Sequence, residues 1–426
     1  MSKDKPLSRW IRRAARFPRL GPGLITGAAD DDPSGIATYS QAGAQFGLNM
    51  LWTIPLTYPL MSAMQMASAR IGRVTGRGLA ANLRRILPSW AVTALVGLLF
   101  VANTINIGAD LAAMGAAAEL VLGWGQYVFT LGFAALSLGL QILVPYHRYV
   151  RFLKWLTLAL FAYFGVVLSM NIDWGEVAAR TVAPRLELTA ATATVVVAVF
   201  GTTISPYLLF WQASEEVEEG EGDPTTGPLL EHPEDAPEQL NRIRWDTYLG
   251  MAFSNLVAFA IMLTAAVTLH AAGAAGIETS ADAAQALRPI AGDFAFALFS
   301  LGVIGTGLLA VPVLAGSAAY AVCEARGWKI GLEHKPREAV GFYTVIGLAV
   351  LVGVLVVYSP VTPIQALFWS AVANGVISVP LMAAMMVVVS HRGAMGRFVA
   401  PAPLVVTGWA ATACMAGAVV LMFVLR

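Results

Sequence analysis

The stretch GAADDDPSGIATYSQ, Gly27 to Gln41, decides the fold because it places three consecutive carboxylates inside a long apolar run. The run covers residues 22–46, which is long enough for a helix to cross a bilayer. Acids at membrane depth are tolerated where they face a water-filled cavity, a partner or a cation. Pro33 removes a backbone donor and disfavours helical geometry at Asp32. The stretch therefore predicts a membrane helix that breaks at Asp32 beside a polar site.

The composition predicts an all-α membrane protein. The chain has 426 residues and is 57% hydrophobic and 12% charged, whereas soluble domains average about 25% charged residues. Helices are the expected spanning elements, because backbone groups in lipid must be satisfied within the segment. We expect eleven transmembrane helices in one domain, 22–426. Their ranges are 22–46, 50–70, 89–117, 124–144, 150–171, 191–213, 248–270, 294–321, 339–358, 363–390 and 402–425.

The basic residues predict the orientation of these spans. All but four of the 27 Lys and Arg fall in segments on the side of the N-terminus, and the exceptions are Arg180, Arg185, Arg288 and Arg426. Cytoplasmic segments carry the excess of Lys and Arg. We therefore expect a multi-pass protein of the cytoplasmic membrane of a prokaryote. Its segment 1–21 and N-terminus would lie inside, and its C-terminus outside.

A second predicted break lies in the sixth span, at GTTISPYLLFW, Gly201 to Trp211. It is five spans after the first, so the two broken helices run in opposite directions. This pattern predicts a five-plus-five inverted repeat, about 22–172 and 191–390, with 402–425 as an extra helix. The breaks would meet near the bilayer midplane and form a transport site.

The breaks offer oxygen ligands for a cation. A helix that stops inside the membrane leaves carbonyls at the negative end of its dipole. Such carbonyls, here near Ala29 and Thr202, form with a carboxylate a hard-oxygen site. We expect Asp32 to be the direct ligand, with Ser205 beside Thr202. Asp30 and Asp31 would face the inner vestibule, line the site or serve structurally.

The half-helices that begin at the breaks offer amide donors instead. They start near Gly35 and Tyr207, and such ends suit an anionic group such as a substrate carboxylate. With Ser34 they are expected to line the substrate site. A carrier of a small organic solute is therefore the alternative hypothesis.

Further polar residues lie on the third and tenth spans. Asn103, Asn106 and Asp110 share one helix face, which suggests a proton or water path or, for the asparagines, hydrogen bonds between helices. Asn374 is expected to line the site or to join helices.

An acidic cytoplasmic loop, 215–245, follows the sixth span. Glu215 and Glu216 would attract cations to the inner vestibule or belong to a solvated charge run. Its Pro- and Gly-rich part favours a mobile linker.

Other function classes lack support in the sequence. It contains no HExxH, P-loop or CxxC motif, and its two cysteines lie in or near apolar spans. We therefore expect that the protein is not an enzyme, holds no resident cofactor and binds no nucleic acid. The lipid bilayer and the transported solute are the expected partners, and the sequence leaves the oligomeric state open.

The stretch LGPGLITGAADDDPSGIATYSQAGAQFGLNMLW resembles the first helix of the Nramp family (natural resistance-associated macrophage proteins). RIGRVTGRGLA, Arg70 to Ala80, resembles the family's loop after the second helix. The resemblance implies the leucine-transporter fold and transport of divalent metal ions, typically manganese and iron, often with protons. It places the family's metal-binding Asp on Asp32 and its carbonyl ligands on Ala29 and Thr202.

Several family ligands differ here. The family's Asn, Met and His fall on Gly35, Ser205 and Tyr207. The Asp of its proton path falls on Asp110, and a second acid on Ala113, so proton coupling is left open. Loss of the soft thioether weakens selectivity for transition metals, and Nramp-related proteins that lack it include magnesium transporters.

We therefore expect a secondary-active or facilitative carrier of divalent cations, magnesium first and manganese second. The organic-solute carrier is one alternative, and a non-transporting sensor or scaffold is another.

Overall fold

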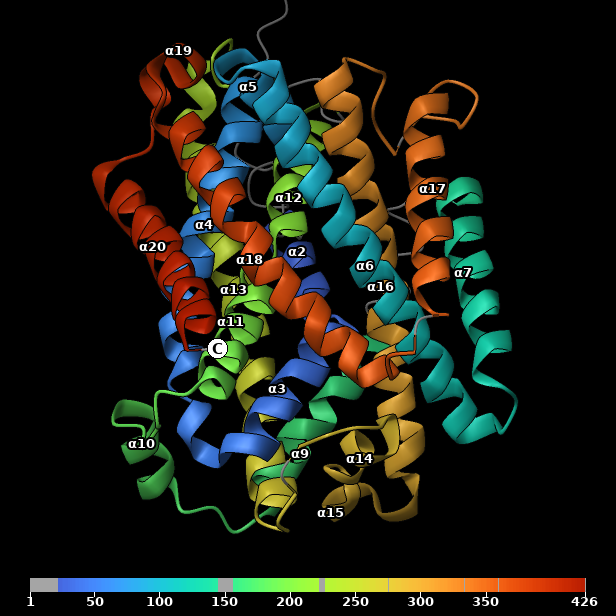
Figure 1. Ribbon diagram of the computed structural model, residues 1–426. Helices are drawn as coiled ribbons and strands as arrows, with labels where there is room; N and C mark the ends of the chain where they lie inside the picture. Colours follow the sequence, from blue (N-terminus) through green and yellow to red (C-terminus); the bar gives the residue numbers. More distant parts are fainter. Residues whose placement is uncertain are drawn as a thin grey trace, which may run out of the picture.

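The structure is a computed structural model that describes residues 22–144, 156–221, 227–274, 276–332, 334–358 and 360–425. Every regular element in these ranges is a helix, as the composition predicts. The predicted N-terminal segment 1–21 lies outside the described residues. Most helices run along one common direction, while α6 and α18 cross the others obliquely (Figure 1).

The first half of the chain contains the following helices in order: α2 (Pro22–Asp30), α3 (Pro33–Phe46), η1 (Gly47–Met50), α4 (Thr53–Thr75), α5 (Leu79–Ile86), α6 (Ser89–Leu122), α7 (Gln126–Leu143), η2 (Leu156–Leu160), α9 (Phe161–Ser169) and α10 (Trp174–Val182). Helix α10 turns away from the segment before it by 114°.

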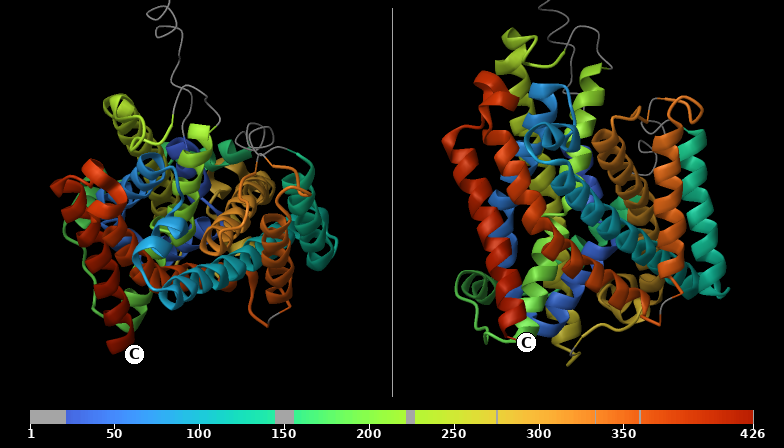
Figure 2. Two further views of the ribbon diagram at one scale, coloured as in Figure 1. Left: turned by 90° about the horizontal axis from the view of Figure 1, so that it is seen from above. Right: turned by 45° about the horizontal axis from the view of Figure 1, so that its top comes forward.

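The second half contains α11 (Ala190–Thr203), α12 (Pro206–Glu221), η3 (Pro233–Asp235), α13 (Ala236–Ala265), η4 (Ala266–His270), α14 (Ser280–Gln285), α15 (Arg288–Ala291), η5 (Gly292–Phe294), α16 (Ala295–Arg326), α17 (Val340–Val356), α18 (Pro363–Ser390), α19 (Arg392–Met395), η6 (Gly396–Phe398) and α20 (Ala402–Val424). Viewed from above, α20 and α7 lie on opposite sides of the bundle (Figure 2).

Each of the eleven predicted ranges contains a helix, but the count of eleven spans stays a prediction. In the described part of the chain, seven helices are long and apolar enough to cross a membrane, or eight if the bent pair 158–169 and 174–182 is one span. Helix α4 is long enough, but it carries Gln65, Arg70 and Arg73, which lower its hydropathy.

The acidic loop predicted at 215–245 is shorter in the structure. Helix α12 continues to Glu221 and α13 already starts at Ala236. The linker prediction can hold only for the residues between them, of which 222–226 lie outside the described residues.

The two broken helices lie in the middle of the bundle. Helix α2 packs against α12 and α13, and α3 packs against α11, α13 and α18. Helices α11 and α18 approach closely because glycines face each other at the contact. A Cβ atom on Gly375 would lie 2.7 Å from the Val197 carbonyl oxygen. Such close packing through small residues is typical of membrane helices, and it fixes α11 next to its break.

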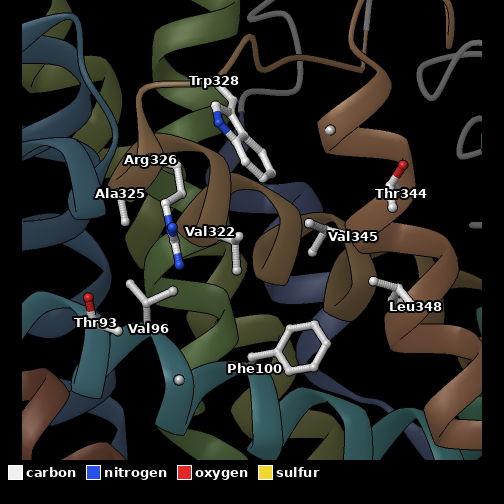
Figure 3. A pocket seen from close by; sticks show the side chains of 12 residues that line it. Thr93, Val96, Phe100, Val322, Ala325, Arg326, Trp328, Thr344, Val345 and Leu348 are labelled. Atoms are coloured by element: carbon white, nitrogen blue, oxygen red, sulfur yellow. The ribbon is translucent and has the colours of Figure 1, made fainter.

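A cleft of about 570 Å³ opens between α6, α16 and α17 (Figure 3). A smaller one, about 390 Å³, lies between α4, α13 and α20. Neither cleft is lined by the residues at the helix breaks.

Candidate functional site

The first break separates α2 from α3 at Asp31 and Asp32. Asp32 is the N-cap of α3, in an extended conformation with φ −72° and ψ 171°. Its Oδ1 accepts hydrogen bonds from the Gly35 amide at 2.7 Å and from the Ser34 hydroxyl at 2.9 Å. The carboxylate thus lies at the positive end of the α3 dipole, where negative charge is stabilised.

The second break separates α11 from α12 at Ile204 and Ser205. The Ser205 hydroxyl lies within donating distance of two carbonyl oxygens, 3.0 Å from Gly201 and 2.7 Å from Thr202. These carbonyls belong to the last turn of α11, where intrahelical partners run out. The Ser205 hydroxyl at the break therefore hydrogen-bonds the Thr202 carbonyl oxygen, which the sequence predicts as a cation ligand.

The two breaks meet at the carboxylate of Asp32. Its Oδ2 accepts a hydrogen bond from the Asn106 amide of α6 at 3.0 Å, and the Tyr207 hydroxyl of α12 lies 3.5 Å away. The same hydroxyl donates to the Ala29 carbonyl oxygen at 3.2 Å. The structure thus brings together Asp32, Ala29 and Tyr207 as expected, while their role as a metal site stays a prediction.

A further contact between the breaks joins two hydroxyls, since Ser34 Oγ lies 3.4 Å from Thr202 Oγ1. Gly35 is also close to this contact, because a Cβ atom there would lie 3.3 Å from Thr202 Oγ1. All these side chains are buried. The site is therefore a small set of neutral hydroxyl and amide groups around one carboxylate.

Asp30 and Asp31 turn away from Asp32. The Ser254 hydroxyl of α13 donates to Asp30 Oδ2 at 2.6 Å and lies 3.3 Å from Asp31 Oδ1. The second oxygen of each of these carboxylates is buried without a hydrogen-bond partner. Among the described residues, no three His, Cys, Asp or Glu side chains gather in a group that could hold a metal ion. Of the three consecutive aspartates, Asp32 is the one that contacts Asn106 and Tyr207.

The residues on α6 divide between two environments. Asn106 belongs to the break itself, since its Oδ1 also accepts from the Ser370 hydroxyl of α18 at 2.7 Å. Asn103 instead joins α6 to α16 through Leu314 O at 2.8 Å and Ser317 Oγ at 2.7 Å. Asn103 therefore forms hydrogen bonds between two helices, and its contacts indicate no step of a proton path.

Within the described part of the chain, two buried polar side chains of α6 and α18 have no hydrogen-bond partner. They are Asp110 on α6, through both carboxylate oxygens, and Asn374 on α18, through both amide atoms. Asn374 is tied to the second break through its backbone, because Ser378 Oγ bonds both Asn374 O at 2.7 Å and Ile204 O at 3.1 Å. Unpartnered buried polar groups are costly. Both residues therefore remain candidates for a solute or proton path.

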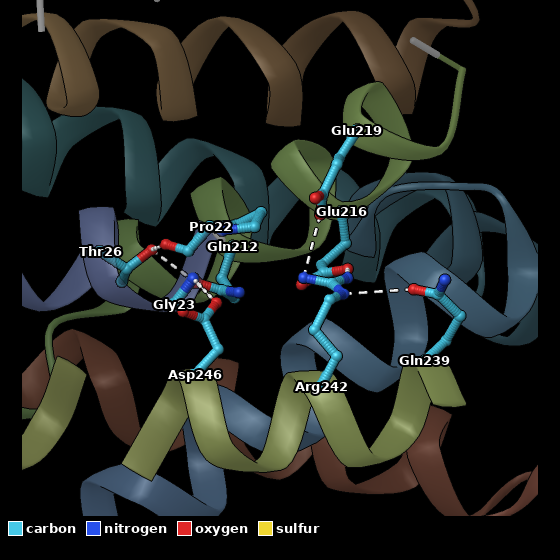
Figure 4. Close-up of polar contacts among 9 residues, drawn as sticks. All are labelled: Pro22, Gly23, Thr26, Gln212, Glu216, Glu219, Gln239, Arg242 and Asp246. Carbon is cyan, nitrogen blue, oxygen red and sulfur yellow. Dashed lines mark hydrogen bonds and ion pairs between the residues drawn. The ribbon is translucent and has the colours of Figure 1, made fainter. Parts of the chain in front are cut away.

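Polar contacts join α2 and α12 to α13 at the end of the bundle predicted to be cytoplasmic (Figure 4). Arg242 of α13 pairs with Glu216 Oε2 at 2.5 Å and with Glu219 Oε2 at 3.0 Å. Glu216 is fully buried, and Glu215 lies beside it on α12. The pairing places Glu216 in a helix contact, and the vestibule role of Glu215 and Glu216 stays a prediction.

Helix α2 is held at the same end. The Gly23 amide donates to Asp246 Oδ2 at 2.7 Å, and the Thr26 hydroxyl donates to Gln212 Oε1 at 2.5 Å. Sequence reasoning missed Ser254, Arg242 and Asp246, because all three lie on α13 and nothing in its apolar pattern indicates which face meets α2 and α12.

A buried carboxylate between two facing helix breaks, inside a bundle of membrane-length helices, is typical of membrane transporters with broken helices. The chain matches the family described as natural resistance-associated macrophage protein-like over residues 23–425. It therefore belongs to the Nramp family, and it is an integral membrane protein with several spans.

Curated relatives agree with this membership, and solved structures agree with the fold. The chain is 28% identical over 319 residues to the divalent metal cation transporter MntH of Erwinia tasmaniensis, covering 72% of this chain and 73% of that protein. It is 27% identical over 420 residues to the MntH of Acidiphilium cryptum, covering 94% and 88%.

Among solved structures, a manganese transporter of Eremococcus coleocola, in complex with an aromatic bis-isothiourea substituted compound, superposes with a TM-score of 0.71 at 15% identity, covering 95% of this chain and 85% of that one. Mhp1, a nucleobase-cation-symport-1 family transporter, superposes with a TM-score of 0.55 at 14% identity, covering 95% and 92%. The predicted leucine-transporter fold is thereby confirmed.

Proposed function

We propose that this protein carries divalent cations across the membrane, magnesium first and manganese second, by alternating access around Asp32. The single observation that carries the proposal is the buried Asp32 carboxylate at the meeting point of the two helix breaks, with Oδ2 directed at Asn106 and Tyr207. The relatives named as divalent metal cation transporters support the same class of solute.

The chemistry of the donors favours a hard cation. The polar groups in contact with the Asp32 carboxylate are two hydroxyls, the Asn106 side-chain amide and the Gly35 backbone amide. The Ala29 carbonyl oxygen lies beyond the Tyr207 hydroxyl, which donates to it. Oxygen ligands suit magnesium and manganese, whereas thioether and thiolate ligands select softer metals. Among the residues that the structure describes, no sulfur atom or imidazole ring takes part in the hydrogen bonds to this carboxylate.

The hydroxyls favour an ion that keeps part of its water shell. Tyr207 donates to the Ala29 carbonyl, and Ser205 donates to the Thr202 carbonyl. An ion that bound these carbonyls directly would have to share each of them with a hydroxyl that already donates to it. A partly hydrated ion can instead use its waters as donors to the carboxylate and carbonyls, and magnesium gives up its waters reluctantly. We therefore propose magnesium ahead of manganese.

The organic-solute alternative depends on free amides at the start of α3. The Gly35 amide donates to Asp32 at 2.7 Å, so it has a partner within the protein. This contact favours the cation over a substrate carboxylate at the first break. We propose the N-terminus inside, the C-terminus outside, and Asp110 as the group to examine for proton coupling.

A flux assay with a panel of solutes tests the proposal. Purified protein in liposomes is offered magnesium, manganese, calcium, amino acids and organic acids, with and without a pH gradient. The account predicts magnesium and manganese flux that falls to background in Asp32→Asn. Asp293→Asn is the matched control, because Asp293 is an exposed aspartate outside the break, and it should keep full flux. Flux of an organic acid without any divalent ion flux would overturn the proposal.

A further inference from the structure

The cleft between α6, α16 and α17 is an apolar groove with an open side. Val96, Phe100, Val322, Val345 and Leu348 supply much of its lining. Its volume of about 570 Å³ falls in the range of about 300–1,000 Å³ that is usual for small-molecule sites. Gly97 also lines the groove, and the space beside it is open, because a Cβ atom on Gly97 would meet no atom within 4 Å. In a membrane, lipid chains are the apolar molecules available to fill such a groove.

One end of this groove carries positive charge. Arg326, at the last turn of α16, lines it, and its guanidinium points toward Thr93 and Val96 of α6 (Figure 3). Among the described residues, no acidic side chain forms an ion pair with Arg326. Arg84 adds a second cation at the same end, since its Nη1 lies 3.4 Å from the carbonyl oxygen of Ala325, another lining residue.

Exposed tryptophans near the Arg326 end of the groove indicate how deep in the membrane this end lies. Trp328 is 51% exposed and lines the groove, and Trp90 at the start of α6 is 75% exposed. The Trp328 ring packs on Gly341 of α17, where a Cβ atom would lie 2.6 Å from the ring. Tryptophan is enriched at the membrane–water interface. The charged end of the groove is therefore at headgroup level, on the side that the basic residues predict to be cytoplasmic.

We propose that this groove binds one anionic phospholipid of the inner leaflet. Its phosphate pairs with Arg326, and one acyl chain lies along Val96, Phe100 and Leu348. Charge complementarity selects the occupant, since an arginine without an acidic partner at headgroup level attracts an anionic headgroup, and basic pockets between membrane helices are established sites for such lipids. This site is separate from the helix breaks and does not depend on which solute is carried.

Native mass spectrometry of the purified full-length protein tests the proposal. The protein is titrated with phosphatidylglycerol and, separately, with phosphatidylcholine of the same acyl chains. Arg326→Gln removes the charge, and Arg85→Gln is its control, because Arg85 is an exposed arginine of α5 that does not line the groove. We expect Arg326→Gln to weaken the tightest phosphatidylglycerol binding roughly fivefold or more, and Arg85→Gln to leave it unchanged.

A second pair of variants tests the groove without changing charge. Gly97→Leu fills the groove, whereas Gly417→Leu on α20 adds the same side chain at an exposed glycine that also has open space. Loss of the tightest phosphatidylglycerol in Gly97→Leu, with retention in Gly417→Leu, supports the site. Equal phosphatidylglycerol binding by the wild type, Arg326→Gln and Gly97→Leu would overturn it. Phosphatidylcholine bound as tightly as phosphatidylglycerol would overturn the assignment of an anionic lipid.

Discussion

Asn106→Ala is expected to weaken cation binding although Asn106 need not touch the ion. Its amide donates to Asp32 Oδ2 at 3.0 Å, and its Oδ1 accepts from the Ser370 hydroxyl at 2.7 Å. Asn106 thus holds the carboxylate in one orientation and is itself held by α18. A hydrogen bond to a charged group contributes about 1.5–3 kcal/mol, and 1.4 kcal/mol corresponds to about tenfold in affinity. The affinity for magnesium should therefore fall by roughly 10- to 100-fold, the range seen for partners of metal ligands.

Asn103→Ala is the matched control for this experiment. Asn103 lies on the same face of α6, but it bonds Leu314 O and Ser317 Oγ of α16. Its loss should lower the thermal unfolding temperature and leave magnesium affinity within about twofold, because it makes no contact with Asp32.

Isothermal titration calorimetry in detergent measures the affinities, and thermal unfolding of the same samples measures stability. If Asn106→Ala bound magnesium as tightly as the wild type, Asp32 would not depend on this contact. An equal loss of affinity in both variants would instead indicate a general effect on the fold of α6.

Three further outcomes follow from the contacts. Arg242→Ala removes the ion pair of the buried Glu216, so the fold should lose about 3–5 kcal/mol. Glu219→Gln removes the more exposed partner of Arg242 and should cost under about 1 kcal/mol, and thermal unfolding of both variants measures the difference. Ser205→Cys places a soft atom beside the second break, so cadmium should inhibit magnesium flux at several-fold lower concentration, and an unchanged inhibition curve would place Ser205 away from the ion. If Asp110 carries a proton, Asp110→Asn should abolish the effect of a pH gradient on flux while flux without a gradient continues; an unchanged response to the gradient would exclude that role.

The positions of the helix breaks could be predicted from the sequence. A proline after Asp32 and after Ser205 removes a backbone donor and disfavours helix at the preceding residue, and the helices end within two residues of the expected places. The meeting of the breaks followed from their spacing of five spans. These predictions depend on the prolines and on the number of spans between them, and both can be read from the sequence.

The direction of individual side chains could not be predicted in the same way. The sequence places Asp30, Asp31 and Asp32 together, but two of them face Ser254 and one faces Asn106. Helical periodicity indicates which residues share a face, and it does not determine how that face is rotated toward neighbouring helices. The sequence therefore predicts for Asn106 either a proton or water path or a hydrogen bond between helices, and the structure has its side chain bonded to Asp32 and to Ser370 of α18.

The acidic segment after the sixth span shows the same limitation. The acidic residues around Glu216 are typical of a solvent-exposed charge run. Glu216 is nevertheless buried against Arg242, which lies 26 residues later on α13. A pairing across two helices depends on their packing, and nothing in the spacing of the residues predicts it.

Crystals soaked in manganese offer the most direct test of the central claim, that Asp32 at the two helix breaks holds a divalent cation. Anomalous scattering locates the metal without any assumption about transport. The account predicts one strong peak beside the Asp32 carboxylate, between the carbonyls of Ala29 and Thr202, and its absence in Asp32→Asn. A peak between Asp30 and Asp31, or no peak at the breaks in the wild type, would contradict it.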